Sequence, residues 1–323
     1  MTIIQGHHKP ADKMTVKKRL PDFFVVGAQK AGTTSLHEWL TKLSAVALPT
    51  LKETHFFRDK ERFDRGVEWY LDQFDWKKDS KVVGEIDPEY MFFPECAQRM
   101  QSLSIKPKLL FVLREPIARA YSHYLMSQRR GYENLSFAEA LSAEDERLKQ
   151  LDNRFSMIHH SYLGRSLYSS QIDYMMKCFP DSDVMFVLFD DLFNESRGLE
   201  VFKQICFFIG LSRNEIDISV IDPKDRSNQA VEPRSLALRN FLYRKSLLKH
   251  TAGKLIPSRT LKIMIFKTIE LLNLRPSKRG NPGNIAAQVP TRVIEMILED
   301  IRRVERLTGF DLRCWDQRPA ESL

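Results

Sequence analysis

The chain of 323 residues is 43% hydrophobic and 28% charged and carries a formal net charge of +8, a composition ordinary for a folded globular protein. It contains no run of about 20 apolar residues, which excludes a membrane-spanning helix from this sequence. The four cysteines are widely separated and form no C-x-x-C pair, which excludes a disulfide framework and favours buried thiols in a reducing compartment.

Residues 1–20 are polar and basic and lack the apolar core of a secretory signal. We therefore expect a flexible basic N-terminal arm, a single domain over residues 21–318, and a cytoplasmic protein of bacterial type. The adjacent histidine pairs His7-His8 and His159-His160 have no ligand partners at useful spacing, so no metal is expected.

Residues 21–40 have the pattern of a buried strand, a loop of small residues and a helix. Phe23 to Val26 form a continuous apolar run, which is typical of a parallel strand covered on both faces. The loop from Gly27 to Gly32 follows, and Thr33 then opens a segment whose apolar residues recur at helical spacing. The first turn of such a helix presents backbone N–H groups and a partial positive charge that can hold a phosphate.

The position of the lysine separates this loop from a nucleoside triphosphate loop. That loop reads G-x-x-x-x-G-K-[ST], whereas here Thr33 stands at the lysine position and Lys30 lies inside the loop. An ordinary strand-to-helix turn is the alternative. We favour a phosphate-binding loop, because the strand, both glycines, the lysine and the paired threonines occur in order. This loop lacks the usual groups that bind the γ-phosphate and the metal.

The segment GAQKAGTTSL resembles the 5′-phosphosulfate loop of sulfotransferases that use 3′-phosphoadenosine 5′-phosphosulfate (PAPS), in the branch of the heparan sulfate enzymes and many bacterial carbohydrate sulfotransferases. The resemblance implies PAPS as sulfuryl donor. It also implies an α/β, P-loop-like three-layer fold with a central parallel sheet of about five strands flanked by helices. The residues that it places on the donor are Gln29, Lys30, Ala31, Gly32, Thr33 and Thr34, and it gives Lys30 a catalytic role as well.

A short second strand over residues 44–50 leads into Lys52 to Phe57, which resembles the K-E-x-H-F-F segment of the family. The resemblance makes Glu53 the general base toward the acceptor hydroxyl. A carboxylate beside a lysine and two phenylalanines can be ionised yet poorly hydrated, although a surface Glu–Lys pair has the same sequence. His55 is the alternative base, because its ordinary pKa is near neutral. Arg58 departs from the Asp that several relatives carry.

Residues 81–85 have the pattern of a third strand, followed by a turn from Ile86 to Tyr90. Relatives read roughly G-E-K-[ST]-P-x-Y here, so Ile86 replaces a lysine. The missing charge suggests an acceptor less anionic than heparan sulfate, and Asp87 remains a candidate to face the pocket. The aromatic run from Trp69 to Trp76 is more typical of a helix packed against the core than of a surface on which a sugar ring stacks.

The fourth strand, KPKLLFVLRE, ends in R-x-P-x-x-R-x-x-S-x-Y, which resembles the 3′-phosphate motif of the family. An arginine fork can bind phosphate bidentately, and a serine hydroxyl can add a hydrogen bond. The resemblance therefore assigns Arg114 and Ser122 to the 3′-phosphate. Pairing of Arg114 with a carboxylate is the alternative.

Further along, SFAEAL and the charged stretch after it indicate a lid-like helical insertion, and the segment from Ser161 to Tyr168 opens a helix running to Cys178. A fifth strand is expected over residues 184–189, then an apolar core helix, and finally a long helix from Pro290 that ends at Gly309. The resemblance brings Tyr168 to the nucleotide and places Arg226 in the loop that closes over the 3′-phosphate and adenosine.

Residues 224–289 are expected to form a basic helical insertion. Between Lys224 and Arg279 there are fourteen Lys or Arg against three Asp or Glu, a bias that favours an anionic partner and is compatible with peripheral contact with an anionic membrane. Nucleic acid is not expected, because no zinc-finger spacing, RNP-like motif or helix-turn-helix is evident.

The combined reading is a sulfotransferase that moves a sulfuryl group from PAPS to a hydroxyl or amine of a carbohydrate, glycolipid or small molecule by in-line displacement. Two alternatives stay open. A P-loop small-molecule kinase would depend on ATP and Mg²⁺, and a non-catalytic basic glycan- or membrane-binding module would tolerate loss of Glu53 and Lys30.

Overall fold

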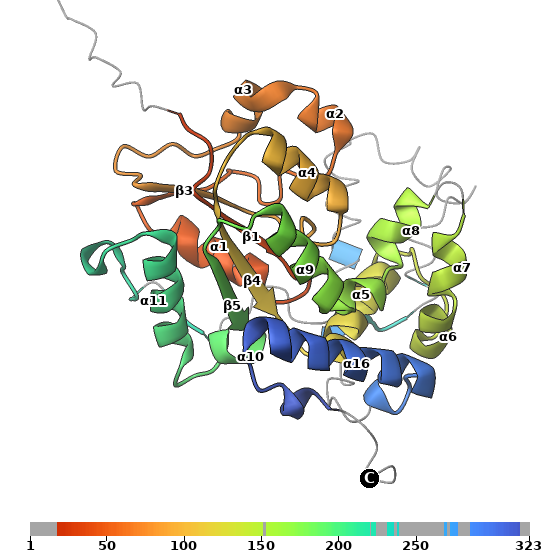
Figure 1. The fold of residues 1–323 in the computed structure, drawn as a ribbon. Helices are drawn as coiled ribbons and strands as arrows, with labels where there is room; N and C mark the ends of the chain where they lie inside the picture. Colours follow the sequence, from red (N-terminus) through yellow and green to blue (C-terminus); the bar gives the residue numbers. More distant parts are fainter. Residues whose placement is uncertain are drawn as a thin grey trace, which may run out of the picture.

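The computed structural model describes residues 18–150, 153–219, 221–223, 231–235, 238, 268–269, 272–276 and 285–316. Its centre is a sheet of five parallel strands in the order β2-β3-β1-β4-β5 (Figure 1). The strands are β1 Phe23–Gly27, β2 Val46–Ala47, β3 Val82–Ile86, β4 Lys108–Leu113 and β5 Val184–Leu188. This confirms the expected α/β fold with a central parallel sheet of five strands flanked by helices.

The α-helices described between and after these strands vary from one turn to five. They are α1 Thr33–Thr41, α2 Lys60–Phe63, α3 Gly66–Leu71, α4 Pro94–Ser102, α5 Pro116–Arg129, α6 Phe137–Ser142, α7 Glu144–Leu148, α8 Arg154–His159, α9 Tyr168–Cys178, α10 Phe189–Leu192, α11 Gly198–Ile209 and α16 Thr291–Thr308. Short 3₁₀ turns occur at η1 Gly164–Ser166, η2 Arg213–Glu215 and η3 Arg313–Trp315.

Strand β1 lies in the middle of the sheet and is buried along its whole length. It pairs with β3 on one side and β4 on the other. The chain therefore winds outward in both directions from β1, and the loops after β1, β3 and β4 leave the same edge of the sheet side by side. Ligands of open α/β sheets bind at such a point, outside the carboxyl ends of the strands.

Helix α5 begins directly after β4 because two local signals coincide there. Pro116 occupies its first position, where a missing N–H costs nothing. The Glu115 carboxylate accepts hydrogen bonds from the backbone N–H groups of Ile117 at 2.8 Å and Ala118 at 2.5 Å. Burial nevertheless raises the pKa of Glu115 to about 7. The helix start fixes where the side chains of the R-x-P-x-x-R motif point.

The terminal helix α16 packs beside α9 in front of the sheet (Figure 1). Asp300 of α16 accepts hydrogen bonds from the backbone N–H groups of Tyr168 at 2.7 Å and Ser169 at 3.2 Å, and so caps α9 from another element. The helix ends at Gly309, whose φ of 74° is left-handed. The C-terminal segment thus fixes the start of the helix that carries Tyr168.

Two expectations differ in detail from the structure, and others fall on residues that it does not describe. The second strand is shorter than expected, since only Val46–Ala47 pair with β3. The basic segment includes two strands that the sequence pattern does not reveal, β6 Val231–Pro233 and β7 Leu274–Pro276, which pair antiparallel. Most of that segment, with Arg226, lies outside the described residues, as do residues 1–17.

All four cysteines are free. The expectation of buried thiols holds for Cys96 and Cys206 but is wrong for Cys314, which is exposed, while Cys178 is half-buried. None of the helices in the described part of the chain has the length and apolar character needed to cross a bilayer.

Candidate active site

The loop between β1 and α1 has the geometry of an anion cradle. Gly32 is the residue before α1 and has a φ of 80°. A Cβ atom at Gly32 would lie 2.2 Å from the ring of Phe193, so glycine is required both for the backbone angle and for space. No side chain caps this helix, and the N–H groups of its first turn are therefore available to an anion.

Lys30 lies in this loop among other cations. Its backbone φ is 73°, and its Nζ lies 3.9 Å from Met126 Sδ. Burial lowers the pKa of Lys30 to about 8, and the positive charges of Arg129, Arg114, Arg130 and Arg119 add to the shift. A bound phosphate or phosphosulfate would supply a counter-charge to this half-buried lysine and its neighbouring arginines.

Arg114 stands at the end of β4 and contacts the same loop. Its Nη1 donates to the carbonyl oxygen of Lys30 at 3.0 Å, and its guanidinium lies 4.6 Å from the centre of the Phe189 ring. The Tyr168 hydroxyl donates to the carbonyl oxygen of Arg114 at 2.8 Å. The structure therefore brings together three of the predicted residues, Lys30, Arg114 and Tyr168. Ser122 lies two turns into α5 and is half-buried.

Arg119 was not among the predicted site residues, although it is the second arginine of the quoted motif. It is fully buried, and its three nitrogens donate to Ser166 Oγ at 2.6 Å, Tyr162 O at 2.5 Å and Gln29 O at 3.4 Å. Burial lowers its pKa to about 10. Arg119 thus ties the loop between β1 and α1 to the turn before α9, and Ser166 Oγ accepts its Nε–H.

The segment after β2 holds the predicted acid–base residues in an unusual backbone conformation. Glu53 has a φ of 65° and His55 a φ of 52°, both left-handed although neither is glycine. The Glu53 side chain is 31% exposed and pairs with Lys52. Strained backbone of this kind persists only where the surrounding structure holds it, and it is frequent in active sites.

A buried carboxyl group holds the residue between them. The backbone N–H of Thr54 donates to Glu85 Oε1 at 3.1 Å, and the Thr54 hydroxyl donates to the same oxygen. The Tyr70 hydroxyl donates to Glu85 Oε2 at 2.6 Å. Burial and the neighbouring charge of Asp87 raise the pKa of Glu85 to about 7. Glu85, at the end of β3, therefore anchors the segment that carries Glu53 and His55.

His55 is oriented by Asp87. Asp87 Oδ2 lies 2.8 Å from His55 Nδ1 and also accepts the backbone N–H of His55 at 3.0 Å. Burial lowers the pKa of His55, but the hydrogen bond and charge of Asp87 outweigh burial, so the net shift is upward. Burial likewise opposes ionisation of Asp87, but His55 lowers its pKa overall. With Nδ1 directed at a carboxylate, Nε2 is the nitrogen left to meet a substrate.

Glu89 connects this segment to the phosphate loop. Its Oε1 accepts from Arg165 Nη2 at 2.9 Å and from Gln29 Nε2 at 3.3 Å, and Oε2 pairs with Arg58. His55, Asp87 and Glu89 offer ligand atoms within 4.8 Å of one another. Both oxygens of Glu89 are bonded to guanidinium groups, so these three side chains form part of an ion-pair network in this structure.

The sequence pattern did not reveal the roles of Glu85, Asp87 and Glu89. Glu85 lies in the third strand and the other two follow it, within the segment compared with G-E-K-[ST]-P-x-Y, and only Asp87 was named there as a candidate to face the pocket. What spacing does not show is that Arg58, in the place of an acidic residue, pairs with Glu89.

The chain is similar in sequence to known sulfotransferases. The family profile described as "Sulfotransferase domain" matches residues 20–237. Human heparan sulfate glucosamine 3-O-sulfotransferase 3B1 is 27% identical over 196 residues, which covers 61% of this chain and 47% of that protein. Human heparan sulfate glucosamine 3-O-sulfotransferase 6 is 28% identical over 202 residues, covering 61% of this chain and 54% of that protein. The chain thus spans about half the length of these curated relatives.

A solved structure has the same fold. The crystal structure of a sulfotransferase from Alicyclobacillus acidocaldarius aligns with a TM-score of 0.62 at 24% sequence identity, covering 92% of this chain and 99% of that one. This likeness extends the fold assignment beyond the region that the family profile matches.

Proposed function

The chain belongs to the sulfotransferase domain family, and on that premise we propose that it transfers a sulfuryl group from PAPS to a hydroxyl of a carbohydrate acceptor. The observation that carries the proposal is the cationic loop, in which Arg114 donates a hydrogen bond to the carbonyl oxygen of half-buried Lys30. A site with this excess of positive charge, at the start of a helix, favours a ligand that carries several negative charges.

PAPS offers anionic groups at two ends, and the site has cations for both. The N–H groups at the start of α1, with Thr33 and Thr34, would hold the 5′-phosphosulfate, while Gln29, Ala31 and Gly32 shape the loop around it. Arg114 and Ser122 would bind the 3′-phosphate. Tyr168 supports Arg114 through its hydrogen bond to the Arg114 carbonyl oxygen. Arg226, which lies outside the described residues, keeps its proposed place near the 3′-phosphate.

The transfer itself is an in-line displacement at sulfur. The acceptor oxygen forms a bond to sulfur while the bond from sulfur to the bridging phosphate oxygen breaks, and 3′-phosphoadenosine 5′-phosphate (PAP) leaves. Glu53 takes the acceptor proton, and Lys30 offsets the charge that develops on the bridging oxygen. His55, held by Asp87, orients the acceptor or the Glu53 carboxylate.

Two substitutions bear on the acceptor. Ile86 stands where relatives carry lysine, and the side chain of Arg58 pairs with Glu89 rather than facing a substrate. We propose that the acceptor carries less negative charge than heparan sulfate. The same transfer could take place on a glycolipid headgroup or a small hydroxylated molecule, and the group that receives the sulfuryl could be an amine instead of a hydroxyl.

Ligand-dependent stabilisation tests the donor assignment. A ligand that binds only the folded protein raises the unfolding temperature. We expect PAPS and PAP to raise it and ATP with Mg²⁺ to leave it near the value without ligand. Stabilisation by ATP with Mg²⁺ and none by PAPS or PAP would support a kinase instead.

A further inference from the structure

The carboxylate of Glu89 bonds to two parts of the site, the loop of residues 28–32 and the segment of residues 52–58. Glu89 follows β3 in a turn and is 2% exposed, so water is largely kept from its side chain. A carboxylate buried to this degree is stable only where counter-charges and hydrogen bonds replace its hydration. Both parts of the site supply such partners, and the roles proposed above for donor binding and transfer do not include Glu89.

One oxygen of Glu89 bonds to the 28–32 loop. Oε1 accepts from Gln29 Nε2 at 3.3 Å and from the buried guanidinium of Arg165 at 2.9 Å. This fixes the orientation of the Gln29 amide, because two acceptor oxygens repel each other. The carbonyl oxygen of Gln29 accepts from Arg119 at 3.4 Å. The residue next to Lys30 is therefore held at its side chain by Glu89 and at its backbone by Arg119.

The other oxygen of Glu89 bonds to the 52–58 segment. Oε2 pairs with Arg58 and lies 3.7 Å from Nδ1 of His55. The backbone N–H of Glu89 donates to Asp87 Oδ1 at 3.2 Å, while the second oxygen of Asp87 contacts His55. Glu89 thus reaches His55 both directly and through Asp87.

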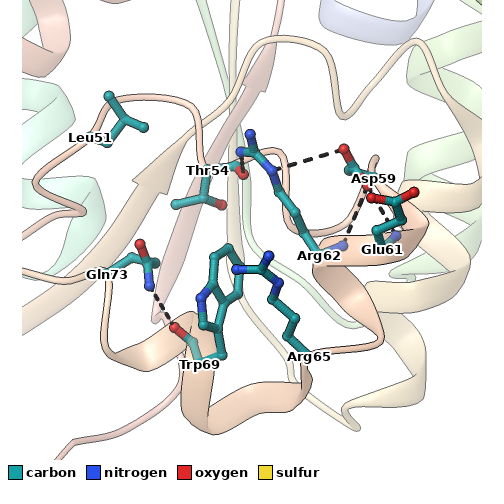
Figure 2. Close-up of a pocket in the computed structure, with 8 residues that line it drawn as sticks. All are labelled: Leu51, Thr54, Asp59, Glu61, Arg62, Arg65, Trp69 and Gln73. Carbon is teal, nitrogen blue, oxygen red and sulfur yellow. Dashed lines mark hydrogen bonds and ion pairs between the residues drawn. The ribbon is translucent and has the colours of Figure 1, made fainter.

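The segment has further anchors, at Thr54, that do not involve Glu89. Glu85 accepts from the backbone N–H and the hydroxyl of Thr54, and Arg62 of helix α2 donates to its carbonyl oxygen (Figure 2). These contacts hold the backbone of the segment in place. Neutralising Glu89 should therefore free the side chain of Arg58 without unfolding the segment.

We propose that Glu89 is a positioning residue for sulfuryl transfer, whose carboxylate holds the 28–32 loop and the 52–58 segment at a fixed separation. The inference rests on the proposed function, in which Lys30 acts on the leaving group and Glu53 on the acceptor proton. In an in-line displacement these two side chains work on opposite sides of one sulfur atom, and a misplacement of about 1 Å can cost about 10²-fold in rate. Because Glu89 acts through other residues, its loss should slow transfer more than it weakens donor binding.

The test compares Glu89→Gln with Glu95→Gln. Each change replaces a carboxylate that pairs with an arginine by a neutral amide of the same shape. Glu95 pairs with Arg154 at 2.7 Å, and in the described part of the chain it bonds to neither the 28–32 loop nor the 52–58 segment. Sulfuryl transfer from PAPS to an octasaccharide of alternating glucuronate and N-acetylglucosamine gives kcat, and calorimetry gives the affinity for PAP.

We expect Glu89→Gln to lower kcat about ten-fold or more and to change the affinity for PAP by less than about two-fold. Glu95→Gln should stay within about two-fold of the wild type in both quantities. The positioning role is refuted if Glu89→Gln keeps the wild-type kcat, if its kcat and its affinity for PAP fall by the same factor, or if Glu95→Gln loses as much kcat.

Gln29→Met covers the case in which Glu89→Gln does not fold. It removes the hydrogen bond from the 28–32 loop to Oε1 and leaves both guanidinium partners of Glu89 in place. Its kcat should fall by a larger factor than its affinity for PAP. An unchanged kcat, or equal losses in both quantities, would contradict the proposal in this variant as well.

Titration of His55 by NMR, in the protein without ligand, tests the same contact independently of activity. Burial lowers the pKa of His55 and Asp87 raises it, and of the weaker influences Arg58 lowers it and Glu89 raises it. Glu89→Gln removes one negative charge and leaves the charge of Arg58 less compensated, so the pKa of His55 should fall. Glu95→Gln should leave that pKa unchanged.

An unchanged or raised pKa of His55 in Glu89→Gln would contradict the role of Glu89, whatever the activity of the protein. A wild type that fails to bind PAP would contradict the proposed function instead. The two claims therefore fail in different measurements.

Discussion

The Asp87 carboxylate holds His55 at two points, since its Oδ2 lies 2.8 Å from Nδ1 and 3.0 Å from the backbone nitrogen of the same residue. This arrangement fixes the ring and raises the pKa of His55 against the effect of burial. A histidine that keeps its proton more firmly is a better hydrogen-bond donor and a poorer base at neutral pH. The relationship therefore favours Glu53 for proton abstraction.

Glu53→Gln should reduce kcat by on the order of 10²-fold or more, because it preserves the shape of the side chain while removing its basicity. Affinity for PAPS should be unchanged. Steady-state kinetics with saturating PAPS, combined with direct binding of PAP, measures both quantities.

His55→Ala is the matched comparison and should lower kcat less than Glu53→Gln. If the ranking is reversed, His55 is the base.

The ion pair of His55 with Asp87 predicts how stability depends on pH. A histidine whose folded-state pKa is raised above its ordinary 6.5 stabilises the fold below that value and loses this contribution as pH rises through the folded pKa. An aspartate whose folded-state pKa is lowered below 3.8 stabilises the fold above pH 3.8. It loses this stabilisation as pH falls through the folded-state pKa. Arg58 opposes the charge on His55, and Glu89 supports it.

The stability of the wild type relative to His55→Asn should therefore be greatest between about pH 4 and about pH 6.5 and should shrink above that window, by about 1.4 kcal/mol for each unit of pKa difference. Urea unfolding of both proteins across this range measures the difference. A stability difference that grows steadily toward alkaline pH would contradict the ion pair.

Arg114 should determine recognition of the 3′-phosphate. Arg114→Ala should weaken PAPS binding by on the order of 2 to 4 kcal/mol, as for removing one partner of a desolvated charge pair. Binding of adenosine 5′-phosphosulfate, which lacks that phosphate, should be weakened much less by the same change. The assignment is wrong if the wild type does not prefer PAPS over adenosine 5′-phosphosulfate, or if the preference survives in the variant.

Lys30 should contribute more to the transition state than to ground-state binding. Lys30→Ala should lower kcat by a larger factor than it lowers affinity for PAP, because only interactions that strengthen in the transition state raise kcat. Calorimetric binding of PAP and single-turnover kinetics give the two factors. If kcat and the affinity for PAP fall by the same factor, Lys30 contributes only to ground-state binding.

Much of the fold can be predicted because its signals are local. The run Phe23 to Val26 predicts a buried central strand, and the structure buries each of these side chains. Gly309 predicts the end of the terminal helix, and it adopts the left-handed conformation there. The second strand was overestimated, because only two residues of SAVALPT pair with β3, and beyond them Pro49 forms only an isolated antiparallel bridge with Phe74.

The side-chain network of the site could not be predicted, because it depends on pairings across the sheet. The contact of Asp87 with His55 requires β2 and β3 to lie side by side and His55 to adopt a positive φ, which no sequence pattern indicates. The pairing of Arg58 with Glu89 likewise follows from tertiary position. Arg119 was visible in its motif, yet its full burial and its three oxygen partners become evident only in the structure.

Transfer of radiolabelled sulfuryl groups from PAPS to an octasaccharide of alternating glucuronate and N-acetylglucosamine is the most direct test of the central claim. The wild type should label the octasaccharide, and Glu53→Gln should label it on the order of 10²-fold more slowly. Labelling from the γ-phosphate of ATP, with none from PAPS, would show that the protein is a phosphoryl-transfer enzyme and would contradict this account.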